Sequence, residues 1–211
     1  MGDSTGDDSG TEQKILEAAR RVFVRRGTAG ARMQEIASVA GVNQALLHYY
    51  FKSKEGLADA VFRDLAGRLL PGVVGVISGE DSIETKVEML VHLYIDLVRE
   101  SPFIPGYVVA EVHQHPDRIA RILERTTVSP EDVRNGLERL GAQLDSAATA
   151  GRIRPIAPLQ FLSTMLGATV APFLILPVMQ HVLGMSEDEF ESFLDARRTE
   201  LPGFILAGLR P

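Results

Sequence analysis

Residues 33–54 read MQEIASVAGVNQALLHYYFKSK, and this stretch decides the fold of the chain. Its first part places apolar side chains three and four residues apart, which is the spacing of one helical face. Gly41 then supplies the left-handed backbone conformation that ends a helix without steric cost. Asn43 is a preferred N-cap for a second helix. The stretch therefore predicts two short helices joined by a tight turn, which is a helix-turn-helix.

The second of these helices separates its side chains by face. Leu47, Tyr50 and Phe51 share one side at helical spacing and are expected to pack inward. Small and hydrogen-bonding groups share the other side, and a helix of this kind can enter the major groove of DNA and read base edges. A short surface helix of any all-α protein is the alternative interpretation. The residues that we predict to read bases are Gln44, Ala45, Leu46, His48 and Tyr49.

A third helix is expected to start directly after this stretch. Ser53 reads as its N-cap, so that Lys54 is its first residue. A cation there opposes the helix dipole, at a cost of about a few tenths of a kcal/mol. A DNA phosphate bound by Lys54 and the free backbone N–H groups explains the misplaced charge, whereas an exposed lysine tolerated by chance is the alternative. The predicted contacts to the DNA backbone are Arg32, Tyr50, Lys52 and Lys54.

Residues 36–57, IASVAGVNQALLHYYFKSKEGL, resemble the DNA-binding domain of the tetracycline-repressor (TetR) family of bacterial regulators. The preceding residues 15–27, ILEAARRVFVRRG, resemble the first helix of that domain. Three positions depart from the family pattern: Ala31 replaces a usual threonine cap, Ala45 a frequent glycine and His48 a frequent tyrosine. The resemblance implies an all-α fold, in which an N-terminal three-helix helix-turn-helix domain is joined to a larger helical ligand-binding and dimerisation domain.

The resemblance also implies partners and a function. The family dimerises through its last two helices, and a two-fold dimer places its recognition helices roughly 34–36 Å or more apart on a palindromic operator. A small-molecule effector would then loosen DNA binding, so the predicted function is that of a ligand-responsive repressor. The alternative is a DNA-binding protein of the same fold without an effector, acting as an activator or architectural factor through a protein partner.

Charge is distributed unevenly along the chain. The 211 residues have a net charge of −6, but residues 11–63 contain nine basic and five acidic side chains, a local charge of +4. A basic head on an acidic body is expected of a DNA-binding protein. The sequence has no cysteine, which excludes disulfides and thiolate metal sites and favours an intracellular, cytoplasmic setting.

The chain divides into three predicted segments. Residues 1–10 are polar and acidic, so we expect a disordered tail that is neither a signal nor a transit peptide. Residues 11–56 form the predicted DNA-binding domain, whose first helix starts at Thr11, carries an apolar stripe and ends at Gly27. Residues 57–211 form the predicted ligand-binding and dimerisation domain. The third helix links the two domains and is expected to stop near Pro71.

The remaining sequence predicts helices and no strand of useful length. A capping-box-like pair, Asp81 and Glu84, opens one helix, and Ser186 and Glu189 open the last. Residues 155–186 carry no charge, but their polar residues and prolines favour buried helices over a membrane span. The C-terminal helices, residues 158–182 and 186–209, are apolar on more than one face, which favours pairing with a second copy. Further helices are expected over residues 104–113, from Pro116, and from Ser129 to Gly151.

An effector cavity is expected among the middle helices, with mainly apolar walls and a few polar anchors. The alternative is that most of these side chains are simply core. The candidate lining residues are Met89, His92, Leu93, Tyr107, Val108, Glu111, Phe161, Met165 and Phe173.

Metal binding and catalysis find little support in the sequence. His113 and His115 are two residues apart, and side chains at that spacing on a helix do not face each other. The sequence contains no P-loop, no GxGxxG and no GxSxG motif. We therefore predict no metal site, no cofactor and no enzymatic activity.

Overall fold

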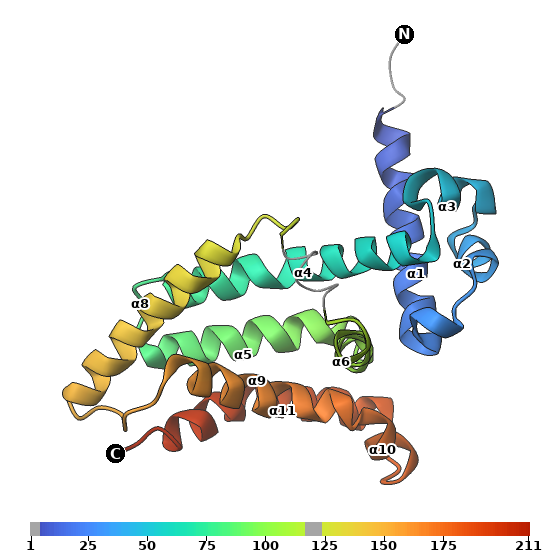
Figure 1. Ribbon diagram of the computed structural model, residues 1–211. Coiled ribbons are helices and arrows are strands. Elements are labelled where there is room, and N and C mark those ends of the chain that lie inside the picture. The colour runs from blue at the N-terminus through green and yellow to red at the C-terminus, as the bar shows by residue number, and fades with distance from the viewer. Residues whose placement is uncertain (1–4, 117–123) are drawn as a thin grey trace. The chain divides into compact units, whose positions relative to one another are not determined.

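The computed structural model describes residues 5–116 and 124–211, and all regular elements in these ranges are helices (Figure 1). The predicted all-α class is therefore confirmed for the described chain. By their contacts the residues form two compact units, Met1–Ala66 with Gly106–Thr126 and Gly67–Pro105 with Thr127–Pro211. This division differs from the predicted boundary after residue 56, because residues 57–66 and 106–126 are grouped with the N-terminal unit.

The first unit is built around the long helix α1 (Thr5–Gly30). This helix starts earlier than the predicted cap, Thr11, and therefore includes residues 5–10 of the predicted disordered tail; residues 1–4 are not described. Its backbone leaves the helical conformation at Gly27, where φ is 67°, as the predicted helix end required. The predicted apolar stripe is confirmed as the core of this unit, because its five members are at most 1% exposed: Ile15, Ala18, Ala19, Val22 and Phe23.

Two short helices complete the helix-turn-helix. Helix α2 (Met33–Ala40) ends at Gly41, which has the left-handed φ of 70°. Helix α3 (Gln44–Phe51) begins after Asn43, whose side chain accepts a hydrogen bond from the Leu46 amide at 3.0 Å. Both features agree with the sequence prediction, because turn glycine and N-cap signals act locally.

Helix α4 (Lys54–Ser78) is continuous from the first unit into the second. Its N-cap is Ser53 as predicted, since the Ser53 hydroxyl accepts a hydrogen bond from the Gly56 amide at 3.0 Å. The predicted stop near Pro71 is wrong, because Pro71 lies inside the helix. Proline removes one hydrogen bond to the carbonyl group four residues earlier. That residue, Gly67, is exposed, so water can satisfy its carbonyl oxygen.

The second unit contains the C-terminal part of α4 with helices α5 (Ile83–Arg99), α8 (Pro130–Thr149), α9 (Pro158–Leu174), α10 (Leu176–His181) and α11 (Glu187–Ala207). Figure 1 shows α5, α8, α9 and α11 gathered in this unit. Their inward side chains form one continuous apolar core. Helix α6 (Ile104–Gln114) belongs to the first unit from Gly106 onward.

Capping residues define most helix starts in the second unit. Ser129 and Asp132 form a complete capping box at α8, and Ser186 and Glu189 form another at α11. Both starts were predicted. The predicted pair at α5 is wrong, because the N-cap is Ser82, which accepts from the Thr85 amide at 3.2 Å. The predicted single helix over residues 158–182 is also wrong.

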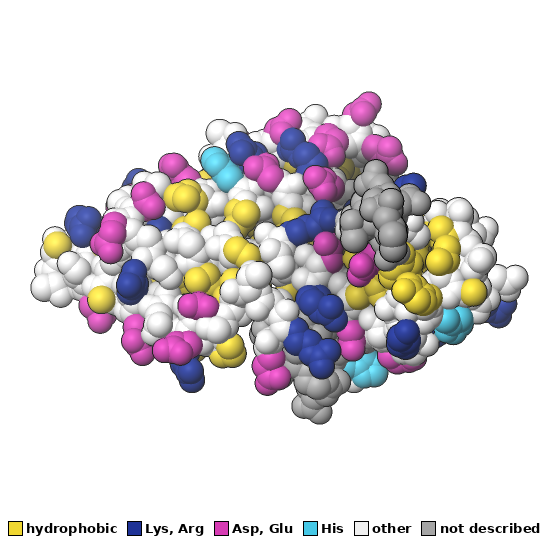
Figure 2. All heavy atoms as spheres, turned by 90° about the horizontal axis from the view of Figure 1, so that it is seen from above, with side chains coloured by type: hydrophobic (Ala, Val, Ile, Leu, Met, Phe, Trp, Pro, Cys, Tyr) yellow, Lys and Arg dark blue, Asp and Glu magenta, His cyan; other side chains and the backbone are white. Residues whose placement is uncertain are grey.

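The helix over residues 158–182 is interrupted at Ile175 and resumes as α10. Pro177 contributes to the break, since it has no backbone N–H to donate to the carbonyl group of Phe173, four residues earlier. The helix predicted from Pro116 falls on residues 117–123, which lie outside the described residues. None of the described helices is both long and apolar enough to cross a membrane. Figure 2 shows acidic and basic side chains interspersed over the face that it presents.

The C-terminal end of α4 is closed by a buried lysine from α5. Lys86 is 0% exposed, and its ammonium group donates to the carbonyl oxygens of Val76 at 2.6 Å, Ile77 at 3.1 Å and Gly79 at 2.8 Å. Burial lowers the pKa of Lys86, and Asp81 partly opposes this effect. The last carbonyl groups of α4 thus receive the donors that a helix end lacks.

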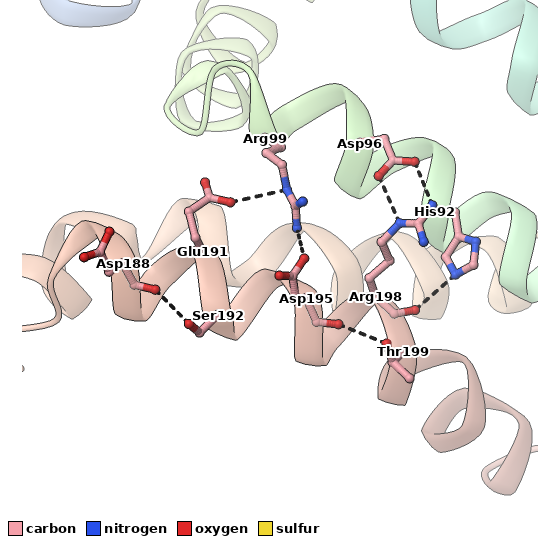
Figure 3. Close-up of polar contacts among 9 residues, drawn as sticks. All are labelled: His92, Asp96, Arg99, Asp188, Glu191, Ser192, Asp195, Arg198 and Thr199. Atoms are coloured by element: carbon pink, nitrogen blue, oxygen red, sulfur yellow. Dashed lines mark hydrogen bonds and ion pairs between the residues drawn. The ribbon is translucent and has the colours of Figure 1, made fainter.

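Polar contacts join α5 to α11 along one side of the core (Figure 3). Arg198 makes two hydrogen bonds to the Asp96 carboxylate, at 3.0 and 3.1 Å. Arg99 pairs with Asp195 at 2.5 Å and with Glu191 at 3.4 Å. Since these contacts occupy the side of α11 that faces α5, they fix the rotation of α11 about its own axis.

Candidate functional sites

The outward face of α3 carries the residues predicted to read DNA bases. Gln44, Ala45, His48 and Tyr49 are exposed, and Tyr49 has an exposed fraction of 65%. Leu46 is half-buried, between the outward and inward faces. The inward residues Leu47 and Phe51 are buried as predicted. The helix therefore presents a polar and aromatic surface over an apolar base.

Side chains on this face are held by one another. The Gln44 Nε2 and His48 Nε2 atoms lie 3.5 Å apart, and His48 Nδ1 lies 3.3 Å from the carbonyl oxygen of Lys52. The Tyr49 and Tyr50 rings meet edge to face, with centroids 5.2 Å apart. Such contacts reduce the rotamer freedom that a binding partner would otherwise have to freeze.

Lys52 ends α3 in an unusual conformation. Its φ is 65°, and it is the only non-glycine residue with positive φ in the described chain. Its ammonium group donates to the Tyr49 carbonyl oxygen at 2.8 Å and lies 5.6 Å from the centroid of the Tyr49 ring. The exposed charge is thereby placed beside the outward face of α3, where a phosphate contact was predicted.

Lys54 has an intramolecular role that the sequence did not indicate. Its ammonium group donates to the carbonyl oxygens of Ala29, in the last turn of α1, at 3.0 Å and of Ala31, just after α1, at 3.3 Å. Lys54 was expected to bind a DNA phosphate because it opposes the dipole of the helix that it begins. The partially negative carbonyl oxygens at and just after the end of α1 supply acceptors for the ammonium group. A phosphate contact through the third N–H of the ammonium group stays a prediction.

The start of α2 lacks a side-chain cap. Arg32 is the N-cap residue, is exposed and makes no capping hydrogen bond, while Ala31 is buried. The first amide groups of α2 are therefore not satisfied by a side-chain cap, which leaves room for an anion there. Arg25 and Arg26 both pair with Glu35 of α2, at 2.6 and 3.0 Å, and these ion pairs fix α1 against α2.

An apolar cavity of about 220 Å³ lies in the second unit, between α4, α5 and α9. Met165 is the one predicted effector-binding residue that lines it. Phe161 and Phe173 are instead buried in the core, at 1% and 2% exposure. The lining residues are Leu69, Val73, Leu90, Tyr94, Leu162, Met165, Leu166 and Thr169.

The three predicted effector-binding residues of α5 have other surroundings. Met89 is exposed. His92 Nε2 lies 3.1 Å from the carbonyl oxygen of Arg198. Leu93 packs against Gly72 of α4, where a Cβ atom would come within 2.8 Å of the Leu93 Cδ2 atom. Glycine at this position therefore permits the close approach of α4 and α5.

The remaining predicted residues, Tyr107, Val108 and Glu111, belong to the first unit. The Tyr107 hydroxyl lies 2.9 Å from the Thr28 hydroxyl, and the Thr28 amide donates to the Glu111 carboxylate at 3.3 Å. The Tyr107 ring stacks on Phe23 with centroids 6.1 Å apart. These side chains attach α6 to the end of α1, and the nine predicted residues do not form one site.

Tyr94 lines the cavity but was not among the predicted effector-binding residues. It lies on the side of α5 that packs against the apolar core of the second unit. Its ring packs edge to face against Phe173, at a centroid distance of 6.2 Å. Its hydroxyl makes no hydrogen bond to any described residue, and burial raises its pKa. Among the described residues, no group of three or more His, Cys, Asp or Glu side chains could hold a metal ion.

The arrangement of α1, α2 and α3 and the polar outward face of α3 define a helix-turn-helix domain. Residues 15–61 match the family model described as "Bacterial regulatory proteins, tetR family". These residues are therefore a DNA-binding domain of the tetR family, and the resemblance seen in the sequence is confirmed.

Known proteins resemble the chain at two levels. The transcriptional regulator BetI of Rhizobium meliloti is 36% identical over 96 residues, which cover 46% of this chain and 46% of BetI. The chain thus matches a little under half the length of this relative. Solved structures match nearly the whole fold. FadR from Bacillus subtilis, in complex with stearoyl-CoA, has a TM-score of 0.65 at 16% identity, over 94% of this chain and 99% of FadR.

FadR from Bacillus halodurans, a fatty acid degradation regulator, has a TM-score of 0.64 at 17% identity and covers 92% of this chain and 94% of that protein. At these identities the likeness concerns the fold. It extends over both the helix-turn-helix and the helical body, which agrees with the predicted two-part architecture.

Proposed function

We propose that this chain is a ligand-responsive, sequence-specific transcriptional regulator, a homodimeric repressor released from a palindromic operator by a small, mainly hydrophobic effector. The observation that carries the proposal is the outward face of α3 within a tetR-family domain. Gln44, Ala45, Leu46, His48 and Tyr49 read bases in this proposal, and Arg32, Tyr50, Lys52 and Lys54 position the DNA backbone.

The direct test is selection of bound sequences from a random DNA pool by the purified protein at near-physiological salt. The expected result is a palindrome whose half-sites are about one helical turn, roughly 34–36 Å, or more apart. Enrichment of a single, non-repeated site would contradict the dimeric readout. No enrichment in either the presence or the absence of added ligand would contradict sequence-specific binding.

Tyr49 offers the sharpest test of the reading face. Because its side chain is 65% exposed, Tyr49→Ala should leave the fold intact. Loss of one good base contact lowers the affinity for the selected DNA by about tenfold or more. Phe103→Ala is the matched control, since it removes an exposed aromatic ring from the second unit and should leave DNA affinity unchanged. Equal affinities of the two variants would remove Tyr49 from the site.

Exposed apolar side chains support a dimer through α9 and α11. Leu159 and Leu166 of α9 are 67% and 56% exposed, and Phe204 of α11 is 77% exposed. Two residues near Phe204 on α11, Gly203 and Ala207, have small side chains and are also exposed. Small residues allow two helices to approach closely, and a partner's surface would remove the apolar side chains from water.

Phe204→Glu tests this interface without removing α11, which supplies part of the core of the second unit. A buried, unpaired carboxylate in the interface strongly opposes association. We expect the variant to be a folded monomer in sedimentation or light scattering. Phe103→Glu is the control and should behave as wild type. A Phe204→Glu protein that remains dimeric would exclude this face.

The cavity supports the ligand-responsive part of the proposal. Its walls come from α4, α5 and α9, and α4 is the helix that also belongs to the helix-turn-helix unit. A ligand that binds one arrangement of these helices better than another would shift the population of α4 conformations. The expected observation is a lower DNA affinity on addition of such a ligand, measured by fluorescence anisotropy.

A further inference from the structure

We propose that the cavity between α4, α5 and α9 selects an uncharged, apolar ligand that carries a single hydrogen-bond acceptor, and that the Tyr94 hydroxyl donates to this acceptor. The inference rests on the proposed function only in taking this cavity as the effector site, and it adds the chemical class of ligand and the group that recognises it.

The absence of charge from the described lining argues for an uncharged ligand. Six of the eight lining side chains are leucine, valine or methionine, and the other two, Tyr94 and Thr169, are neutral. A carboxylate or ammonium group buried among them would lose its hydration without gaining a counter-ion. A ligand with a charged part would therefore have to keep that part outside.

The two hydroxyl groups of the cavity lining, those of Thr169 and Tyr94, differ in whether they are free to donate a hydrogen bond to a ligand. The Thr169 hydroxyl already donates to the carbonyl oxygen of Met165 at 2.8 Å. The Tyr94 hydroxyl has no hydrogen-bond partner among the described residues. Because burial raises the pKa of Tyr94, its proton stays in place at neutral pH and is available for donation. A carbonyl, ether or alcohol oxygen would satisfy this donor.

The volume limits what can enter. About 220 Å³ is below the range of roughly 300–1,000 Å³ that is typical of pockets for drug-sized ligands. The cavity therefore fits a small molecule or the end of a longer one. A single aromatic or aliphatic group with one oxygen atom meets the limits of size, charge and hydrogen bonding together.

Three small probes separate these requirements. Acetophenone has an apolar ring and one carbonyl oxygen, ethylbenzene has nearly the same shape without the oxygen, and benzoate carries a negative charge. Binding to the full chain is measured by calorimetry or by ligand-detected NMR. We expect acetophenone to bind most tightly, ethylbenzene more weakly and benzoate not at all.

Two matched variants assign the effect to one hydroxyl group. Tyr94→Phe should weaken acetophenone binding about fivefold, the loss of one hydrogen bond, while ethylbenzene binding stays unchanged. Tyr107→Phe removes a hydroxyl from the first unit and should change neither probe. If Tyr107→Phe and not Tyr94→Phe weakened acetophenone binding, the α6 residues predicted from the sequence would form the site.

Other outcomes overturn the proposal directly. Benzoate binding as tightly as acetophenone, equal losses of both neutral probes in Tyr94→Phe, or no binding of any probe would each refute it. Failure of the proposed function is seen separately, in DNA binding without probes. Acetophenone that binds through Tyr94 without changing DNA affinity would support the ligand class and contradict the regulatory role of the cavity.

Discussion

The two ends of α4 are each held by a lysine, and the two lysines lie in different surroundings. At the N-terminal end, the half-buried Lys54 donates to the carbonyl oxygens of Ala29 and Ala31. At the C-terminal end, Lys86 donates to three carbonyl oxygens from a position with 0% exposure. Water competes for the first set of hydrogen bonds, whereas two of the three hydrogen bonds in the second set are buried. Similar chemistry should therefore contribute very different amounts to stability.

The largest effect is expected from Lys86→Met, which keeps most of the side-chain volume and removes the ammonium group. The buried carbonyl groups of Val76 and Ile77 then lose this donor, and the part-buried Gly79 carbonyl keeps only the Gln143 side-chain amide. We expect the free energy of unfolding of the second unit to fall by about 3 kcal/mol. Urea denaturation, combined with amide hydrogen exchange in α5, measures the loss and locates it.

Lys14→Met is the control for this substitution, because it makes the same chemical change at an exposed position of α1. The free energy of unfolding of Lys14→Met should stay within about 0.5 kcal/mol of the wild-type value. If Lys86→Met cost no more than this control, water would have to reach the end of α4, and the contrast between the two lysines would disappear.

Lys54→Met should lower the free energy of unfolding by an intermediate amount, about 1 kcal/mol, because the two carbonyl oxygens that accept from Lys54 are partly accessible to water. Hydrogen exchange should increase at the C-terminal end of α1 and the start of α2, and not in α5. A rise in stability instead would mean that the repulsion between Lys54 and the dipole of α4 outweighs its hydrogen bonds. DNA affinity measured on the same protein separates a phosphate contact, which should weaken all sequences about equally, from a purely structural role.

The smallest change in the free energy of unfolding is expected from Asp96→Asn. This substitution extends the comparison to the ion pair between Asp96 and Arg198, whose side chains are 54% and 39% exposed. Exposed pairs contribute only about 0.5 kcal/mol because water and salt screen them.

The hydrogen bond from Arg198 lowers the pKa of Asp96. The contribution is therefore present above the pKa of about 3.9 in the unfolded chain and is lost as the pH falls through the lowered value. Thermal unfolding of both proteins between neutral pH and pH ~3 measures the difference. A gap that persisted in acid would assign the effect of Asp96→Asn to something other than this charge pair.

Helix ends were predictable from the sequence where the signal is local. Gly41, Asn43 and the serine caps of α8 and α11 act on backbone groups within a few residues, so the sequence around them is sufficient. Pro71 misled the prediction because the effect of a proline depends on whether water can reach the carbonyl group that it leaves free. That access depends on packing, which the residues around Pro71 do not specify.

The functional sites show the same limit. The exposed face of α3 follows from a helical period within eight residues and was predicted correctly. The role of Lys54 was missed because its acceptors, Ala29 and Ala31, lie 25 and 23 residues away in the sequence. The cavity was largely missed for a related reason. Three helices must pack before a side chain such as Tyr94 can be distinguished from its core neighbours.

The left-handed φ of Lys52 has a consequence for attempts to improve this protein. A residue with a Cβ atom in that conformation carries strain of about 1 kcal/mol, which glycine would relieve. A laboratory selection for heat resistance alone should therefore favour Lys52→Gly, and the selected protein would lose the cation beside Tyr49. A selection that also demanded DNA binding should restore the lysine. The residue found at position 52 would then show whether a selected protein had been selected for thermal stability alone or also for DNA binding.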